Sequence, residues 1–459
     1  MKELKLLSLV LVAGTATMFT ACTSESDNSP SAKISYESVA AAQQVPVTFG
    51  TYIGEQAITR AGYKGSINTP AELQAQSFGV FAYYSEGDGS SAGAYNSSTS
   101  APNFMWNQEV TYSSGWTYTP VKYWPNEADT NTDVDGSATT TSGKDVLSFF
   151  AYAPYVSPTT KSDGTFSPAQ ADGITQLSGN TVAGDPKVTY AVATDADNTV
   201  DLLWAVAAAD QTTPTVTGGT WSNVLAGKPF INLVKPMLAA TPASTPINFS
   251  FKHALAKLVF TVEGEFDEVS TDNNNVDTSK TRIVIDNVAI TSTFNTNGIL
   301  NLNNGTANVP NWTLGGTANL ALNINNDDIV GTTAGSAGLK YNSGTDTFAG
   351  QPLGVTKTPQ HLMDADGTTK FFALIPQTAN MTITITYHVF TLDTNLANGY
   401  SKITNVITKT ISSLALAGSN AYTINMRLGM ETVSFNASVA PWGAGGTTDV
   451  DLPLNVTTS

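Results

Sequence analysis

Cysteine is almost absent from the chain, whose 459 residues contain one, Cys22. Because one thiol cannot form an internal disulfide, packing must supply the stability of the fold. Charged residues are also scarce, at 13%, about half the usual share in soluble proteins. The net charge of −16 excludes the basic surface that nucleic-acid binding requires. With 9% aromatic residues for a core, we expect a globular protein without a nucleic-acid partner.

Catalytic patterns are missing as well. The three histidines, His253, His361 and His388, form no local His–His or Cys–His pattern, so zinc sites and Cys–His catalysis have no support. His253 follows a predicted strand, and we expect it to be a packed or capping residue. A Gly-x-Ser-x-Gly string at residues 89–93 lies in a Gly/Ser-rich segment, without the strand-to-helix turn that this nucleophile motif needs. We therefore predict a protein that is not an enzyme and has no cofactor.

One acidic segment has the spacing of half a calcium loop. Asn131, Asp133 and Asp135 precede Gly136, but Ser142 stands where the bidentate Glu of such a loop would be. A solvated acidic loop is favoured over a calcium site, and we predict no metal.

The N-terminus has the pattern of a secretory signal. A short charged start is followed by an almost wholly apolar run at residues 6–19 and by the small residues Thr20 and Ala21. This run is too short for a permanent membrane helix, which needs about 20 apolar residues. Phe19-Thr20-Ala21-Cys22 resembles the bacterial lipobox, which predicts cleavage before Cys22 and a lipid on its thiol. An ordinary signal peptide with an incidental cysteine is the alternative.

The rest of the chain predicts many strands and few helices. After a flexible Ser-, Ala- and Asn-rich tether that extends to residue 44, helical character is limited to residues 70–76 and 252–257. Short β-branched or aromatic runs are separated by Gly, Asn, Asp and Pro clusters. The predicted strands are residues 78–84, 147–152, 247–251, 257–262, 282–290, 381–390, 403–411 and 422–430. This pattern indicates an all-β protein of antiparallel sandwiches.

A weak internal repeat indicates two domains. Phe149-Phe-Ala-Tyr-Ala-Pro154 recurs as Phe371-Phe-Ala-Leu-Ile-Pro376 in the corresponding part of the second half. Both copies end an apolar strand at a proline. We place the boundary in residues 236–246, which contain three prolines.

The first strand of the mature chain is followed by a candidate cleavage site. Val45, Val47, Phe49 and Ile53 belong to an alternating strand with one buried face at residues 45–53. Arg60, before Ala61, is flanked by small residues in a predicted exposed loop, the preferred kind of site for proteolysis. The other two arginines, at positions 282 and 427, lie in strand patterns.

The C-terminal tail resembles this first strand. Val450, Leu452, Leu454 and Val456 alternate, and residues 452–458 match residues 45–51 in character, proline included. The tail is therefore predicted to replace the first strand once cleavage at Arg60 removes it. The alternative is two unrelated edge strands, where proline is tolerated.

The order of several short motifs resembles the fimbrillin family, the subunits of type V pili of Gram-negative anaerobes. The motifs are Thr59-Arg60-Ala61, Phe78-Gly-Val-Phe-Ala-Tyr-Tyr84, Trp116-Thr-Tyr-Thr-Pro-Val-Lys-Tyr-Trp-Pro125, Leu147-Ser-Phe-Phe-Ala-Tyr-Ala-Pro-Tyr155, Asp201-Leu-Leu-Trp-Ala205 and His253-Ala-Leu-Ala-Lys-Leu-Val-Phe260. The resemblance implies two transthyretin-like β-sandwich domains in tandem and export to the cell outer membrane as a surface-exposed lipoprotein. It also implies cleavage by an arginine-specific protease and donor-strand polymerisation into a fimbrium.

These interpretations divide the chain into a signal peptide (1–21), a tether (22–44), a removable strand and cleavage loop (45–60), an N-terminal domain (61–245), a C-terminal domain (246–446) and a donor tail (447–459). The expected partners are other fimbrillin subunits, in a homo- or hetero-polymer, the processing protease and, before processing, the outer-membrane lipid. Host or bacterial surface ligands are compatible with this role.

Two other roles stay open. An anchor or tip adhesin of the same system would keep its first strand or fold its own tail in. A surface glycan-binding lipoprotein could use Trp106, Trp116, Tyr123 and Trp124 as an aromatic platform, although aromatic residues at strand spacing are more often part of a core.

Replacing Cys22 by Ala should abolish incorporation of a fatty-acid analogue and stop delivery of the precursor to the outer membrane, because the thiol is the predicted acceptor of the lipid. Metabolic labelling followed by membrane fractionation measures both effects. Labelling equal to that of the wild type would rule out lipidation at Cys22.

Overall fold

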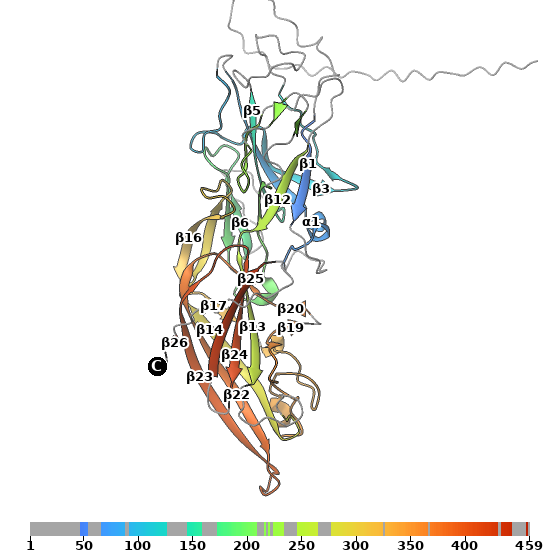
Figure 1. The fold of residues 1–459 in the computed structure, drawn as a ribbon, viewed down its shortest axis with the longest axis vertical. Coiled ribbons are helices and arrows are strands. Elements are labelled where there is room, and N and C mark those ends of the chain that lie inside the picture. Colours follow the sequence, from blue (N-terminus) through green and yellow to red (C-terminus); the bar gives the residue numbers. More distant parts are fainter. Residues whose placement is uncertain are drawn as a thin grey trace, which may run out of the picture. The chain divides into compact units, whose positions relative to one another are not determined.

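The computed structural model describes residues 46–53, 66–87, 91–125, 145–157, 172–208, 215–216, 219–220, 224–233, 246–264, 277–324, 326–365, 368–429, 433–442 and 456–457. These segments are nearly all β (Figure 1), which confirms the predicted fold class. Every strand predicted between residues 78 and 430 is present, with differences of a few residues at the ends. Among the described residues, no helix has the length and apolar character needed to cross a membrane.

The first sheet contains eight strands. Its order is β1 (Phe49–Ile53), β12 (Ile247–His253), β8 (Leu203–Ala207), β5 (Val146–Ala153), β2 (Phe78–Ser85), β3 (Met105–Tyr112) and β4 (Trp116–Thr117), with β11 (Phe230–Leu233) also paired to β5. The pairs are antiparallel except for β1 and β12, which run parallel. β12 follows the predicted boundary at residues 236–246 but lies in this first sheet, and the division into two domains stays a prediction.

Two five-stranded sheets contain most of the remaining strands. One has the order β18 (Gln360–His361), β13 (Ala256–Gly264), β24 (Asn420–Leu428) and β25 (Val433–Pro441), with β21 (Phe372–Leu374) paired to β13. The other has the order β17 (Ala321–Asn323), β14 (Thr281–Ser292), β22 (Thr378–Leu392), β23 (Tyr400–Ala415) and β26 (Val456–Thr457). β13 and β24 run parallel.

A four-stranded sheet joins the two halves of the sequence. Its order is β16 (Asn311–Ala318), β15 (Asn295–Asn301), β7 (Lys187–Ala191) and β6 (Gly173–Leu177). β9 (Thr215–Val216) pairs with β10 (Gly219–Thr220), and β19 (Asp364–Ala365) pairs with β20 (Thr368–Thr369). Short 3-10 turns occur at η3 (Ala196–Asn198), η5 (Asn326–Asp328) and η6 (Ser343–Thr345).

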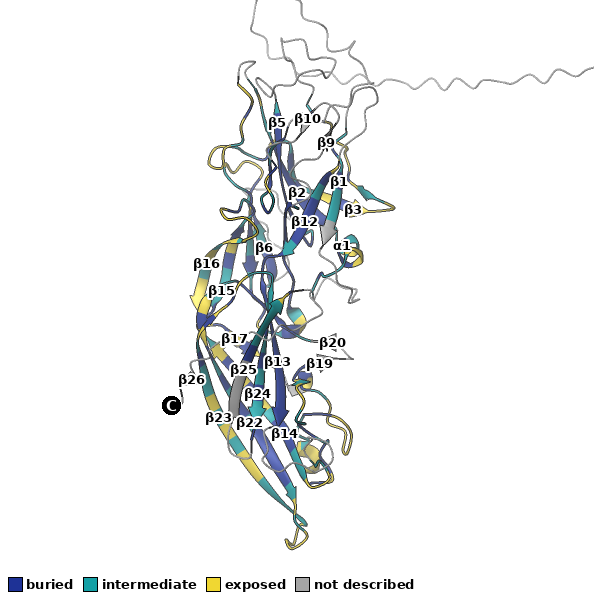
Figure 2. Cartoon of the chain, viewed as in Figure 1, coloured by how far each residue is buried: buried dark blue, intermediate teal, exposed yellow. Residues whose placement is uncertain are grey.

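Burial follows the position of each strand within the sheets (Figure 2). β5 is buried along its whole length, whereas β23 has many exposed side chains. One hydrophobic cluster covers the face of the first sheet that includes Phe49. A larger cluster covers the opposite face and includes most strands of the second half of the sequence. Both faces of the first sheet are therefore covered, as the continuous apolar sequence of β5 requires.

The α-helix α1 (Pro70–Gln76) confirms one of the two helical predictions. Thr69 accepts a hydrogen bond from the Glu72 backbone and Glu72 accepts one from the Thr69 backbone, which is a complete capping box. The second prediction, a helix at residues 252–257, is wrong. There, β12 ends and β13 begins with only Ala254 and Leu255 between them. Leu202 accepts from the Ala254 N–H, so tertiary contacts outweigh the local helix propensity.

Candidate functional site

β1 lies at an edge of the first sheet, and in the described part of the chain β12 is its strand partner (Figure 1). The parallel register places Phe49 opposite Ile247, whose N–H donates to Thr48 O at 2.9 Å. Val47 N donates to Lys122 O, also at 2.9 Å. The backbone of the first segment is thus held on both sides, by the pairing with β12 and by the hydrogen bond to Lys122.

Four aromatic rings surround Phe49, and we call them the aromatic seat. The centroid of Phe49 lies 5.4 Å from Tyr118, 5.6 Å from Phe249, 6.0 Å from Phe149 and 6.3 Å from Phe78. Phe49 is 6% exposed. Burial of such a side chain is worth about 1.5–3 kcal/mol, and suitably oriented ring pairs add to it. Side-chain packing therefore stabilises β1 in the sheet.

Two polar contacts fix the position of this segment further. Tyr118 Oη donates to Val47 O at 2.8 Å, and Trp116 Nε1 donates to Thr51 Oγ1 at 2.9 Å. Burial raises the pKa of Tyr118 to about 12, so the phenol keeps its proton at neutral pH and remains a donor. Both donors come from the β4 region of the same sheet.

The predicted residues of the first strand are only partly described. Val47 is 1% exposed and Phe49 is close to it in burial, as the alternation requires. Ile53 is the last residue of β1 and pairs with Phe251. Cys22, Val45, Arg60 and Ala61 lie outside the described residues. Their predicted roles stay predictions.

The C-terminal strand β26 also lies at a sheet edge. Val456 pairs with Ile411 and Thr457 with Thr410, antiparallel to β23 of the same chain. Val450, Leu452 and Leu454 lie outside the described residues. The sequence did not predict this pairing, because nothing in the alternation of the tail names its partner strand.

The aromatic residues considered as a glycan platform differ in their exposure. Trp124 is 2% exposed, and Trp106 and Trp116 are half-buried. Trp106 Nε1 donates to Ser178 O at 2.8 Å, while Tyr123 is 45% exposed. The tryptophans therefore belong mainly to the interior, in line with the favoured interpretation.

Two of the histidines, His253 and His388, are buried, and His361 is exposed. His253 is the last residue of β12 and is 6% exposed, as predicted for a packed histidine. His388, in β22, lies with Nδ1 2.9 Å from Thr404 Oγ1. Burial, with a smaller contribution from Lys402, lowers the pKa of His388. His361 lies in β18.

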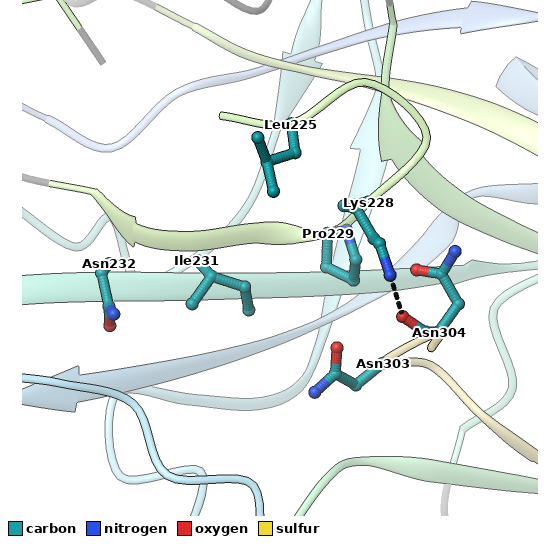
Figure 3. A pocket seen from close by; sticks show the side chains of 7 residues that line it. All are labelled: Leu225, Lys228, Pro229, Ile231, Asn232, Asn303 and Asn304. Atoms are coloured by element: carbon teal, nitrogen blue, oxygen red, sulfur yellow. Dashed lines mark hydrogen bonds between the residues drawn. The ribbon is translucent and has the colours of Figure 1, made fainter. Parts of the chain in front are cut away.

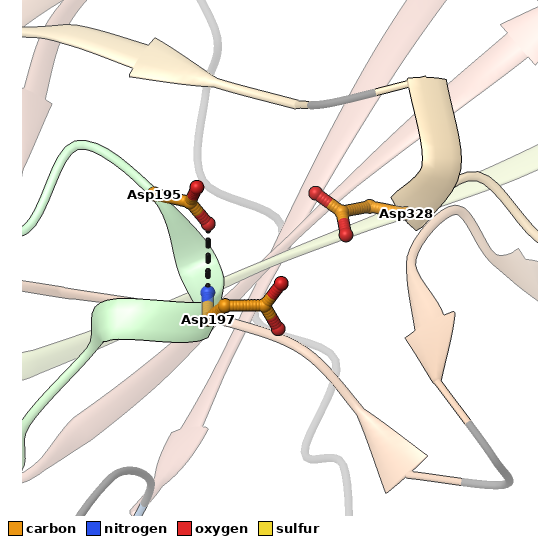
Figure 4. A group of neighbouring side chains, drawn as sticks. All are labelled: Asp195, Asp197 and Asp328. Carbon is orange, nitrogen blue, oxygen red and sulfur yellow. Dashed lines mark hydrogen bonds between the residues drawn. The ribbon is translucent and has the colours of Figure 1, made fainter.

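Three carboxylates meet near η3 and η5 (Figure 4). Asp195 Oδ1 accepts from the Asp197 backbone at 2.9 Å, and Asp328 faces both residues. Lys370 Nζ forms ion pairs with Asp328 and, at 2.8 Å, with Asp197. Burial lowers the pKa of Lys370, but the hydrogen bonds to both carboxylates outweigh it and raise the pKa overall. One ammonium group thus pairs with two of the three carboxylates and offsets part of their negative charge.

A pocket of about 340 Å³ lies between β11 and the loop after β15 (Figure 3). Its lining residues are Leu225, Lys228, Pro229, Ile231, Asn232, Asn303 and Asn304. Lys228 Nζ donates to Asn304 O at 2.8 Å. Since no carboxylate or histidine lines this pocket, it offers no acid–base pair for catalysis.

Solved structures with this fold are known. The chain is similar to a fimbrial protein from Bacteroides vulgatus ATCC 8482, with a TM-score of 0.50 and 18% identity over 87% of this chain and 99% of that chain. A candidate cell adhesion protein from Bacteroides uniformis ATCC 8492 aligns over 87% of this chain and 99% of that one, with 14% identity and a TM-score of 0.38. The first similarity shows a shared all-β fold.

Residues 237–442 match the model of the fimbrillin-like family. The predicted resemblance is thereby confirmed, and this part of the chain is fimbrillin-like. The comparison with curated proteins finds no match.

Shortening Phe49 should destabilise the protein, because Phe49→Ala empties the aromatic seat. We expect a loss of about 3–5 kcal/mol, typical of a buried Phe→Ala change, measured from urea unfolding of the uncleaved protein. Thr48→Val is the matched control, since Thr48 Oγ1 is buried without a hydrogen-bond partner among the described residues and its loss should be nearly neutral. If the Phe49→Ala variant is as stable as Thr48→Val, packing of Phe49 in the aromatic seat does not stabilise the protein.

Replacing Lys370 should also destabilise the protein. Lys370→Met leaves the carboxylate of Asp328, only 4% exposed, without its ammonium partner, at a cost of roughly 3 kcal/mol. The control is Lys340→Met, because its partner Asp327 is 98% exposed and water screens that pair. Urea midpoints measure both variants, and equal shifts would show that the cluster is not a buried ion pair.

Proposed function

We propose that this protein is a structural, non-enzymatic subunit of cell-surface fimbriae, exported as a lipoprotein through Cys22, cleaved after Arg60 and polymerised by donor-strand exchange. The observation that carries the proposal is the position of β1, an edge strand whose Phe49 side chain fills an aromatic seat. The fimbrillin-like sequence of residues 237–442 supports the same role. The subunit reaches the outer membrane before it enters the fimbrium.

Loss of the first segment would create a binding groove. If cleavage after Arg60 releases residues 46–53, the rings of Phe78, Tyr118, Phe149 and Phe249 lose the side chain that covers them. The edge of β12 also loses its hydrogen-bonding partner. An exposed apolar floor beside an unpaired strand edge is the kind of site that binds an extended segment by strand addition.

The C-terminal tail of another subunit has the sequence to fill this groove. Aligned on the two prolines, Leu454 takes the place of Val47 and Val456 that of Phe49. Burial of four apolar side chains is worth roughly 6–12 kcal/mol before the cost of ordering the tail. Because this contact is head-to-tail and does not close into a ring, it extends into a filament.

The tail must first leave its own chain. β26 pairs with β23 through Val456 and Thr457 alone among the described residues. At about 1 kcal/mol net for each hydrogen bond, the release of a two-residue pair costs less than the groove would return. Donation of the tail is therefore energetically feasible.

A terminal position in the same fimbrium is the second candidate. The pairing of β26 with β23 favours it, because a tip subunit would keep its tail folded on its own domain. An anchor subunit would instead keep β1 in its seat. Stalk and tip subunits differ in whether the tail leaves after cleavage, whereas an anchor subunit would not lose β1.

Cleavage by an arginine-specific protease should give one new N-terminus, Ala61, and should trigger polymer formation. Leu454→Asp should block elongation, because it would bury an unpaired charge in the groove at a cost of several kcal/mol. Asn455→Asp is the matched control, since the alternation points it outward. N-terminal sequencing and light scattering measure the two steps.

Arg60→Ala should resist cleavage and stay monomeric. Deletion of residues 447–459 should leave a folded monomer that does not elongate after cleavage. If the deletion variant is unfolded before cleavage, the tail belongs to its own domain and the tip assignment replaces the stalk assignment. If the Leu454→Asp and Asn455→Asp variants elongate equally, the tail is not the donor strand.

A further inference from the structure

Two segments on either side of the proposed switch meet in the folded protein. Ser66 opens the described segment that follows the Arg60 region, and Trp442 ends the one that precedes β26. They are 376 positions apart, yet Trp442 Nε1 donates to Ser66 Oγ at 2.8 Å. Trp442 is 7% exposed and Ser66 is half-buried, so this hydrogen bond is partly shielded from water.

The indole is held from its face as well as from its edge. Its ring stacks on His253 with the centroids 4.2 Å apart and the planes 2° from parallel. Phe371 packs against it edge-on at 5.8 Å. The Trp442 backbone N–H donates to Ser419 O at 2.7 Å. The end of β25 is thereby fixed beside the end of β12.

A buried carboxylate ties the Ser66 segment to the same place. Asp201, 1% exposed, accepts from Ile67 N at 2.9 Å and lies 2.9 Å from His253 Nδ1. A buried carboxylate is costly unless donors surround it. The Ile67 N–H is one of these donors, so displacement of the Ser66 segment would weaken the set of contacts that positions His253 and, through it, Trp442.

We propose that Ser66, Ile67, Asp201, His253 and Trp442 form a clasp that keeps the C-terminal strand on its own chain until the first segment has been cleaved. This inference rests on the proposed function. In the uncleaved chain, the Ser66 segment continues toward β1 on one side and into the capped helix α1 on the other, and Ile67 is 5% exposed. Cleavage at Arg60 removes the connection to β1, and a chain tethered at one end has more conformations to gain.

If the Ser66 segment moves away, Trp442 Nε1 loses its hydrogen-bond acceptor, Ser66 Oγ. Asp201 then also loses a hydrogen-bond donor, the Ile67 N–H. Trp442, which precedes the tail, then has fewer contacts that fix its position. As a result β26, which among the described residues is paired with only two residues of β23, detaches more often. The clasp thus couples removal of the first strand to presentation of the last one, which would prevent premature polymerisation.

Hydrogen–deuterium exchange of the purified, uncleaved full-length chain tests the clasp without any need for polymerisation. Ser66→Ala should speed exchange in peptides from residues 443–459 about fivefold, equal to roughly 1 kcal/mol, the usual worth of one hydrogen bond. Ser178→Ala is the matched control, because it also removes one hydroxyl acceptor, that of Lys187 N, but far from the clasp along the chain.

Trp442→Phe keeps a ring for stacking on His253 and removes the same hydrogen bond from the other side. Ser66→Ala also removes the hydrogen bond that Ser66 Oγ donates to Asn68 Oδ1 at 2.8 Å. The double variant should therefore exchange little faster than Ser66→Ala alone, since that variant already lacks the bond that Trp442→Phe deletes. Cleavage at Arg60 should speed exchange of the tail in the wild type and add little in Ser66→Ala.

The clasp proposal is wrong if hydrogen–deuterium exchange in residues 443–459 is unchanged in Ser66→Ala, or if Ser178→Ala has an equal effect. It is also wrong if the wild-type tail already exchanges at the rate of an unstructured peptide. If the clasp fails while cleaved wild-type protein still polymerises, the proposed function stands. If the clasp variants release the tail but cleaved protein does not polymerise, the coupling stands and the fimbrial function does not.

Discussion

The packing of Phe49 against four aromatic rings is the interaction on which the proposed switch depends. β1 has one strand partner in the described chain, with which all five of its residues are in register, and burial of Phe49 adds to this pairing. An edge strand held in this way can be exchanged for another segment of similar pattern without disruption of the strands beneath it. The eight-stranded sheet supplies the rigid floor, since β5 and β2 are almost wholly buried.

The same sheet also connects the two ends of the described chain. β12 contacts β1 along its length, and its last residue, His253, stacks on Trp442 at the end of β25. A change at the first strand and a change at the root of the C-terminal strand therefore act on one common element. In the proposed assembly, this arrangement gives a physical basis for order, because the segment whose removal would open the groove and the segment that would fill a neighbour's groove are not independent.

Much of the fold could be predicted from local sequence. Thr69, Pro70 and Glu72 are a complete helix start signal, and α1 begins there. The apolar runs around Phe149 and Phe249 are strands because β-branched and aromatic residues between turn formers have few other stable conformations. The prediction failed at residues 252–257, where His-Ala-Leu-Ala-Lys has helix-forming composition. There the carbonyl of Leu202 and the N–H of Ser419 hold the backbone between two strands.

The sequence by itself determined the all-β class, the alternation of Val47 and Phe49 and the similarity of the tail to the first strand, because period and composition are local properties. Only the tertiary structure decided that β1 runs parallel to β12, that β26 lies on β23 and that Trp442 reaches Ser66. Each of these joins segments far apart in the chain. Strand alternation states which face of a segment is buried, but the partner that buries it is selected by packing of the whole chain.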